Sequence, residues 1–223
     1  MANEKYADVL GDWLVEMGYT HCFMLAGGGC MHLIDGFRSR FTCIPVVHAM
    51  ASMGWGLASA VGAAFARPGQ RVVLAEGDGS FSQNLQELAI VRRHGLPVKM
   101  FLIANGGYAS IRATQRKFFQ GAYVGCDEAT GLGFPDWIAL FLAFGIPAET
   151  LSPSDMVAER LAAMMDRPGP AAWVVHVDPD QPNFPAVTSR ILPDGSMESN
   201  SLSRQQPPLP PEIQIEVTRF LPS

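Results

Sequence analysis

The sequence lacks several features that would place it in a class at once. No stretch approaches the ~18 uninterrupted apolar residues of a membrane span, and the first five residues form no apolar signal segment. The 16 Lys+Arg and 21 Asp+Glu, a net charge of -5, form no block of one sign. This distribution argues against nucleic acid or an acidic membrane as a partner. We therefore expect a soluble cytoplasmic protein whose partner is a small molecule or another copy of itself.

Several reactive motifs are also missing. The four cysteines, Cys22, Cys30, Cys43 and Cys126, form no C-x-x-C pair, which favours reduced core thiols over a metal or disulfide role. The sequence contains no P-loop and no G-x-S-x-G. The glycines at 27–29 begin a dinucleotide fingerprint, but His32 stands where its last glycine belongs. A nicotinamide or nucleotide enzyme is therefore not favoured.

What is present indicates a globular α/β protein. The 223 residues suffice for one large domain or two small ones, and 48% of them are hydrophobic against 17% charged. Apolar runs of strand length alternate with helical patterns, which predicts a doubly wound, mostly parallel sheet with helices on both faces. We expect strands at 21–25, 42–47, 71–75, 98–104 and 171–177, and helices around 9–17, 31–37, 52–66, 82–93, 135–144 and 153–165.

Proline is concentrated at the end of the chain. Eight of the 17 prolines fall within residues 181–223. Such a segment cannot form a regular helix or a central strand. It reads as an extended arm that lies over the domain or reaches a neighbouring subunit, and disorder beyond Ser199 is the alternative.

One turn suggests a phosphate and metal site. Gly77-Asp78-Gly79-Ser80 closes a predicted strand and opens a helix, where glycines and free N–H groups favour an anion. Asp78 has the wrong charge for a phosphate unless a divalent cation lies between them, as Mg²⁺ commonly does. An ordinary strand-to-helix turn is the alternative.

Asn105 strengthens the metal hypothesis. It follows the next predicted strand, 27 residues after Asp78, and precedes Gly106-Gly107-Tyr108. Because neighbouring parallel strands end at one edge of a sheet, Asp78 and Asn105 can share one ion. An amide oxygen is a suitable hard ligand, and the glycines leave backbone carbonyls accessible as further ligands.

These two segments, with that spacing, resemble the Mg²⁺–diphosphate motif of thiamine-diphosphate enzymes, in particular the acetolactate-synthase-like group. The stretches 52–57, 61–64 and 82–88 resemble the same pyrophosphate-binding domain, and the likeness runs from about 51 to 178. The resemblance implies that Asp78, Asn105 and the Gly107 carbonyl hold Mg²⁺. It also implies that Gly77, Gly79, Ser80 and Tyr108 lie in the cofactor site.

Two further positions bear on that resemblance. Met53 matches the large apolar residue that holds the cofactor in its bent shape, with an ordinary core methionine as the alternative. The family usually carries two asparagines at the second ligand site, and Ala104 replaces the first of them here. The inferred ligand, Asn105, is retained.

The front of the chain, residues 6–48, resembles the first half of the family's pyrimidine-binding domain. In that pattern His48 would be followed by a glutamate that activates the cofactor, whereas this chain has Ala49. Glu76 and His48 are the nearest replacements by sequence. We expect three parts: a partial pyrimidine-binding segment (1–48), a pyrophosphate-binding domain (49–180) and the arm (181–223). The front segment should extend the main sheet or pack loosely.

Two functions follow from the resemblance. The first is Mg²⁺-dependent thiamine diphosphate binding, with 2-oxo acid decarboxylation or carboligation if the chain is active, and a homodimer as the implied assembly. The second is a shortened, catalytically silent relative that serves as a cofactor-binding or interaction module. A third explanation is a deletion or a mis-joined reading frame at the His48/Ala49 junction. The sequence does not identify the substrate.

Overall fold

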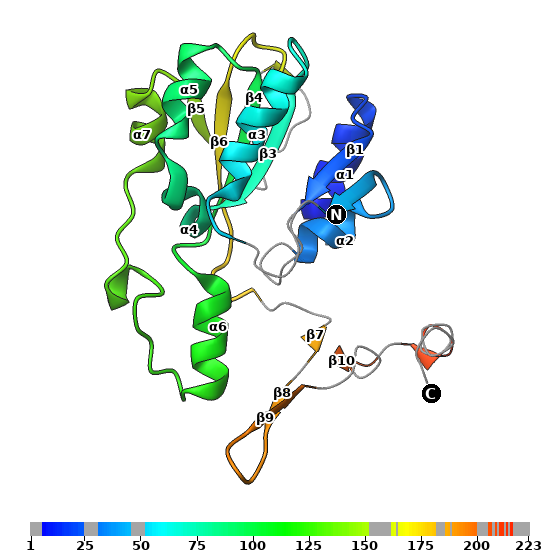
Figure 1. Cartoon of the computed structure of the whole chain (residues 1–223), viewed down its shortest axis with the longest axis vertical. Helices are drawn as coiled ribbons and strands as arrows, with labels where there is room; N and C mark the ends of the chain where they lie inside the picture. Colours follow the sequence, from blue (N-terminus) through cyan, green and yellow to red (C-terminus); the bar gives the residue numbers. More distant parts are fainter. Residues whose placement is uncertain are drawn as a thin grey trace. The chain divides into compact units, whose positions relative to one another are not determined.

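The computed structural model describes residues 6–24, 31–45, 52–151, 162–163, 165–181, 186–187, 189–199 and 205–206, with a few isolated positions up to 215. The chain divides into two compact units, Met1–Gln181 and Pro182–Ser223. The first unit contains the sheet and the residues singled out above, and Figure 1 shows its elements.

The elements of the first unit alternate as the sequence predicts. In chain order they are α1 (Tyr6–Glu16), β1 (His21–Met24), α2 (Met31–Phe37), β2 (Thr42–Pro45), α3 (Trp55–Ala66), β3 (Val72–Gly77), α4 (Asp78–Phe81), α5 (Glu87–Arg93), β4 (Val98–Ala104), α6 (Ala109–Phe118), α7 (Trp137–Ala143), β5 (Ala148–Leu151) and β6 (Ala171–His176). The described residues also include 3₁₀ turns at Ser82–Asn84 and Glu128–Thr130.

Four of these strands form the main sheet, in the order β3-β4-β6-β5, and all of its pairs are parallel. In β4, Met100 and Leu102 belong to one buried cluster and Phe101 to another, as the alternation of side chains along a strand requires. The first cluster joins the sheet to α3, α5 and α7, and the second joins it to α1 and α2 (Figure 1). The α/β prediction with helices on both faces is confirmed.

The segment before α3 has a small sheet of its own. Strands β1 and β2 pair with each other in parallel, and they do not extend the four-stranded sheet. Leu10, Trp13 and Leu14 of α1 pack in the same cluster as Phe101 and Trp173 of the main sheet. The first of the two expectations for this segment, an extended main sheet, is therefore wrong, because its strands pair locally and α1 makes the packing contact.

Several boundaries differ from the sequence prediction. The helix expected at 82–93 is divided into a 3₁₀ turn at Ser82–Asn84 and α5, and the short helix α4 precedes it. The side chains of Ser82 and Asn84 bond to the backbone carbonyls of Gly79 and Gly54, and such bonds compete with helix continuation. Helix α6 and strand β5 were not predicted, and most of the helix expected at 153–165 lies outside the described residues.

The second unit consists of short antiparallel pairs in its described part. Strand β8 (Ser189–Ile191) pairs with β9 (Met197–Ser199), and β7 (Ala186–Val187) pairs with β10 (Gln205–Gln206). Asp194 closes the turn between β8 and β9 by accepting bonds from the N–H and hydroxyl of Ser196. The described strands are two or three residues long, which agrees with the exclusion of a central strand by proline.

Candidate functional site

The ends of β3 and β4 bring the predicted ligands together. The two strands pair in parallel with Gly77 opposite Ile103, so Asp78 and Asn105 follow at the same edge of the sheet. Figure 1 shows α4 and α6, the helices that follow these strands, at that end. Ligands tend to bind at the carboxyl ends of the strands in open parallel sheets.

Asp78 is a buried carboxylate held by backbone N–H groups. Its side chain is only 1% exposed, and its two oxygens accept hydrogen bonds from the N–H groups of Gly79 and Gly106, both at 2.8 Å. Burial raises the pKa of this carboxyl, and the surrounding N–H groups lower it in part. None of the ion pairs of the described residues involves Asp78. A buried negative charge without a protein cation is well suited to a bound one.

Asn105 and Gly107 supply neutral oxygens beside it. The Asn105 side-chain oxygen accepts the Gly107 N–H at 3.2 Å. A Cβ placed on Gly79 would lie 3.2 Å from the Gly107 carbonyl oxygen, so that carbonyl adjoins the Asp78 turn. The described residues contain no group of three His, Cys, Asp or Glu able to hold a metal. One carboxylate with neutral oxygens is instead the kind of set that binds Mg²⁺ together with phosphate oxygens and water, so these residues fit the ion.

The backbone at Gly107 has no room for a side chain. Its φ is +150°, and a Cβ there would lie 2.1 Å from the Cys126 carbonyl oxygen. The next N–H, that of Tyr108, donates to the same oxygen at 2.8 Å, and Gly107 forms an isolated antiparallel bridge with Asp127. Contact with a second loop therefore fixes the Gly107 carbonyl.

Ser80 has its hydroxyl engaged within the protein. The hydroxyl donates to Glu76 Oε1 at 2.6 Å and accepts the Gly54 N–H at 2.9 Å. Any contact of Ser80 with a diphosphate therefore falls to its backbone N–H. The side chain instead joins the turn after β3 to the turn before α3.

Glu76 is a residue of β3 whose side chain meets the start of α3. Among the described residues, its buried Oε2 has no hydrogen bond of good geometry, and a Cβ on Gly56 would lie 2.6 Å from it. Burial raises the pKa of Glu76, while the Ser80 hydroxyl and the N–H groups of Gly56 and Leu57 lower it. These N–H groups belong to the first turn of α3, so the carboxylate compensates the positive end of that helix.

Met53 lies in the turn before α3, and Tyr108 packs against the turn after β3. Met53 precedes Gly54 and has a side chain 49% exposed, so it is not a core methionine. The Tyr108 hydroxyl accepts a bond from Gln83 at 2.9 Å, and its ring would lie 2.5 Å from a Cβ on Gly79. Glycine is therefore required at position 79 for Tyr108 to pack there.

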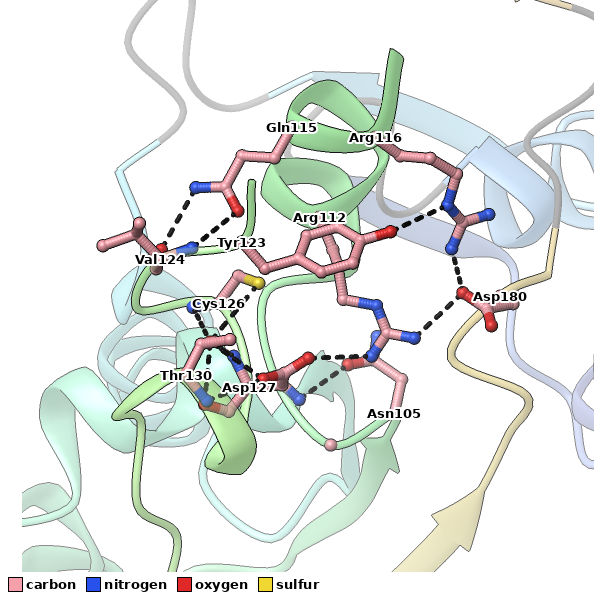
Figure 2. Close-up of polar contacts among 12 residues, drawn as sticks. Asn105, Arg112, Gln115, Arg116, Tyr123, Val124, Cys126, Asp127, Thr130 and Asp180 are labelled. Atoms are coloured by element: carbon pink, nitrogen blue, oxygen red, sulfur yellow. Dashed lines mark hydrogen bonds and ion pairs between the residues drawn. The ribbon is translucent and has the colours of Figure 1, made fainter. Parts of the chain in front are cut away.

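Sequence reasoning missed a polar network beside the site. Figure 2 shows Arg112 and Arg116 of α6 pointing toward Asp180, which follows β6, and Arg112 also reaching Asp127. Two signals could have indicated it: the arginines are spaced i,i+4, and Asp127-x-x-Thr130 is a capping-box pattern.

Some of the positions named from the sequence are not among those the structure describes. The glycines at 27–29, Cys30, His48 and Ala49 belong to this group. Among the described residues, no helix is long and apolar enough to cross a membrane.

The chain is similar to known thiamine pyrophosphate enzymes. Residues 27–176 match the model of the family "Thiamine pyrophosphate enzyme, C-terminal TPP binding domain". The acetolactate synthase isozyme 2 large subunit of Escherichia coli (strain K12) is 37% identical over 155 residues, which cover 70% of this chain and 27% of that protein. The acetolactate synthase large subunit of Parasynechococcus marenigrum (strain WH8102) is 31% identical over 170 residues, covering 76% and 26%.

A solved structure shows the same fold. The Rhodococcus jostii RHA1 thiamine diphosphate-dependent 4-hydroxybenzoylformate decarboxylase matches with a TM-score of 0.60 and 20% identity, over 77% of this chain and 32% of that one. The chain spans about a quarter of the length of the curated relatives it matches. The chain therefore belongs to the thiamine pyrophosphate enzyme family through its C-terminal TPP-binding domain.

Proposed function

We propose that this chain binds thiamine diphosphate through a Mg²⁺ ion held by Asp78, Asn105 and the Gly107 carbonyl. The observation that carries the proposal is the buried Asp78 carboxylate, surrounded by N–H groups and absent from the ion pairs of the described chain. A divalent cation would balance that charge and would bind a diphosphate at the same edge of the sheet. Gly79 and the backbone of Ser80 are the groups placed to meet it.

The reaction we propose is decarboxylation of a 2-oxo acid or carboligation. Thiamine diphosphate supplies an electron sink for a carbanion formed next to a carbonyl. The named activities of the relatives, acetolactate synthase and 4-hydroxybenzoylformate decarboxylase, lie in this class. In this chain Met53 would contact the cofactor from the turn before α3, while Glu76 and Ser80 hold that turn in place.

A silent cofactor-binding module is the second candidate, and one residue favours it. Ala49 occupies the position where the family pattern has a glutamate, and an alanine can neither donate nor accept a proton. Pyruvate turnover separates the two candidates. A rate clearly above that of free thiamine diphosphate supports the enzyme, and a rate equal to it with intact binding supports the module.

We also propose a homodimer in the cytoplasm. The dimer rests on the family resemblance, and sedimentation of the full chain at several concentrations tests it. The compartment rests on the cysteine pattern of the sequence, which has no C-x-x-C pair and favours reduced thiols, as suits a reducing environment.

Titration calorimetry tests the binding proposal. Wild-type protein should bind thiamine diphosphate saturably with Mg²⁺ and lose at least about tenfold in affinity when the metal is chelated. Asp78→Ala and Asn105→Ala should remove the metal dependence. Glu128→Gln, a change of an exposed carboxylate near the site, is the control and should bind like wild type. Saturable binding that both ligand variants leave unchanged would overturn the assignment.

A further inference from the structure

Helix α6 and the loop at 119–132 are held together by polar side chains. None of the residues of α6 is buried, so apolar packing does not fix this helix. The Gln115 side chain donates to the Val124 carbonyl and accepts its N–H, both at 3.1 Å. Arg116 donates to the Tyr123 hydroxyl at 3.2 Å (Figure 2).

The same loop presses against the proposed cation site. The Cys126 carbonyl accepts the Tyr108 N–H and lies where a Cβ of Gly107 would be. Asp127 forms the backbone bridge to Gly107. The position of the Gly107 carbonyl thus depends on where Cys126 and Asp127 are held.

Asp127 connects the loop to α6 through its two carboxylate oxygens. Its Oδ1 accepts the Thr130 N–H at 3.1 Å and the Thr130 hydroxyl at 2.8 Å. The Asp127 N–H in turn donates to the Thr130 hydroxyl oxygen at 3.1 Å, which completes a capping box. Its Oδ2 accepts from Arg112 at 3.4 Å. One oxygen therefore shapes the loop internally, and the other ties it to the helix.

Arg112 contacts both Asp127 of the loop and Asp180, which follows β6. Its second guanidinium nitrogen donates to Asp180, beyond β6, at 2.9 Å. Its side chain is 17% exposed, whereas that of Arg116, which shares Asp180, is 51% exposed. Because partial burial strengthens an ion pair, the Arg112 contacts should matter and the Arg116 contact should contribute little.

We infer that Arg112 is a positioning residue, which sets the Gly107 carbonyl at the cation site by holding Asp127 and Asp180 together. The inference rests on the proposed Mg²⁺ site. It assigns to α6 a task that its surface location alone does not suggest. Among the described residues, the Arg112 side chain bonds to Asp127 and Asp180 and to none of the three proposed ligands.

The test compares Arg112→Gln with Arg116→Gln in the full chain. The first readout is hydrogen exchange of the Tyr108 amide without ligands, which reports the bond to Cys126. It should quicken at least about tenfold in Arg112→Gln and stay within about twofold of wild type in Arg116→Gln.

The second readout is the Mg²⁺ concentration that gives half-maximal thiamine diphosphate binding. It should rise by about 10-fold or more in Arg112→Gln, the usual cost of losing a residue that orients a metal ligand, and binding should recover at saturating Mg²⁺. Arg112→Lys, which keeps the charge but not the two-sided geometry, should fall between wild type and Arg112→Gln.

Asp127→Asn is the second variant, since it keeps an oxygen for Thr130 and loses the charge for Arg112. It should reproduce both effects, including in the event that Arg112→Gln does not fold. Unchanged Tyr108 exchange in both variants, or equal Mg²⁺ shifts in Arg112→Gln and Arg116→Gln, overturns the inference. A wild-type chain without Mg²⁺ dependence instead refutes the proposed function, while the exchange data still report on the contact.

Discussion

The two ends of the main sheet each bury a charge, and they balance it in different ways. At the amino end Lys99 of β4 is fully buried, and its ammonium donates to the carbonyls of Arg167 at 2.7 Å and Gly169 at 2.9 Å. At the carboxyl end Asp78 is almost as deeply buried and is held by two N–H groups. Both charges cost desolvation free energy, which must be offset.

At the amino end of the sheet, groups of the protein itself compensate the buried charge. The Lys99 bonds hold the turn before β6, and the neighbouring Arg71 pairs with Asp166 at 3.0 Å. A cavity of about 670 Å³ lies there, lined by Arg71, His94 and Arg167 among others. With Lys99 and Arg71 already bonded to protein groups, we interpret this end as structural.

At the carboxyl end of the sheet, the described chain compensates the buried charge only in part. Asp78 and Glu76 are both acidic and both have pKa values raised by burial, yet only Glu76 adjoins the positive end of a long helix. Asp78 is left beside neutral oxygens from Asn105 and Gly107. A buried charge that the protein's own groups compensate therefore indicates a structural role. A buried charge that they compensate only in part indicates a ligand site.

The largest expected effect tests the close backbone contact of Gly107 at the carboxyl end of the sheet. Gly107→Ala would place a Cβ 2.1 Å from the Cys126 carbonyl oxygen at φ +150°. We expect a loss of about 3 kcal/mol or more in the free energy of unfolding. The control is Gly106→Ala, where φ is +75° and nothing lies within 4 Å, so strain alone should cost roughly 1–2 kcal/mol. Equal losses in urea titrations would contradict the described contact.

Lys99→Met tests the amino end. The Arg167 and Gly169 carbonyls would lose their donor, which should cost about 1–3 kcal/mol of stability. Lys117→Met, an exposed site, should stay within about 0.5 kcal/mol of wild type. Urea unfolding at neutral pH measures both changes.

The same variant carries a pH signature. Burial, with Arg71 and Arg167 nearby, lowers the pKa of Lys99 below its ordinary 10.5. The unfolded chain therefore holds this proton more tightly, so wild-type stability gains from this group as pH rises through the folded pKa toward 10.5. The deficit of Lys99→Met relative to wild type should grow over that interval. A deficit that shrinks would mean that burial does not oppose the charge.

The smallest effect separates the two acids of the carboxyl end. Glu76→Gln removes a buried charge but also the compensation of α3, so stability should fall by only about 1 kcal/mol. The Mg²⁺ concentration that gives half-maximal cofactor binding should stay within about threefold of the wild-type value, because the Glu76 carboxylate compensates the positive end of α3. Glu87→Gln, at the start of α5, is the control. A loss of Mg²⁺ dependence in Glu76→Gln would assign both acids to the cation.

The core of the site could be predicted from the sequence because it follows a rule of parallel sheets. Both strands that precede Asp78 and Asn105 were predicted, and β4 runs over Val98–Ala104 as expected. Once two neighbouring strands are parallel, the residues after them must meet at one edge. The placement of these two side chains therefore needed no knowledge of long-range packing.

The surroundings of the site could not be predicted, because they depend on contacts between residues that are far apart in the sequence. Arg112 contacts Asp127 and Asp180, which lie 15 and 68 residues away in the sequence, from a helix that has no buried residue. The Ser80 hydroxyl has a partner on either side, Glu76 and Gly54, which only the approach of α3 brings together. Sequence pattern reports burial, and such polar contacts depend on the finished fold.

The most direct test of the contrast between the ends is ligand-linked stability. Urea unfolding of wild type, Asp78→Asn and Lys99→Met would be measured with and without thiamine diphosphate and Mg²⁺ at about 100 times the wild-type Kd. Wild type and Lys99→Met should each gain about 2.7 kcal/mol over their own ligand-free values, and Asp78→Asn should gain almost nothing. An equal gain in Asp78→Asn, or its loss in Lys99→Met alone, would contradict the account.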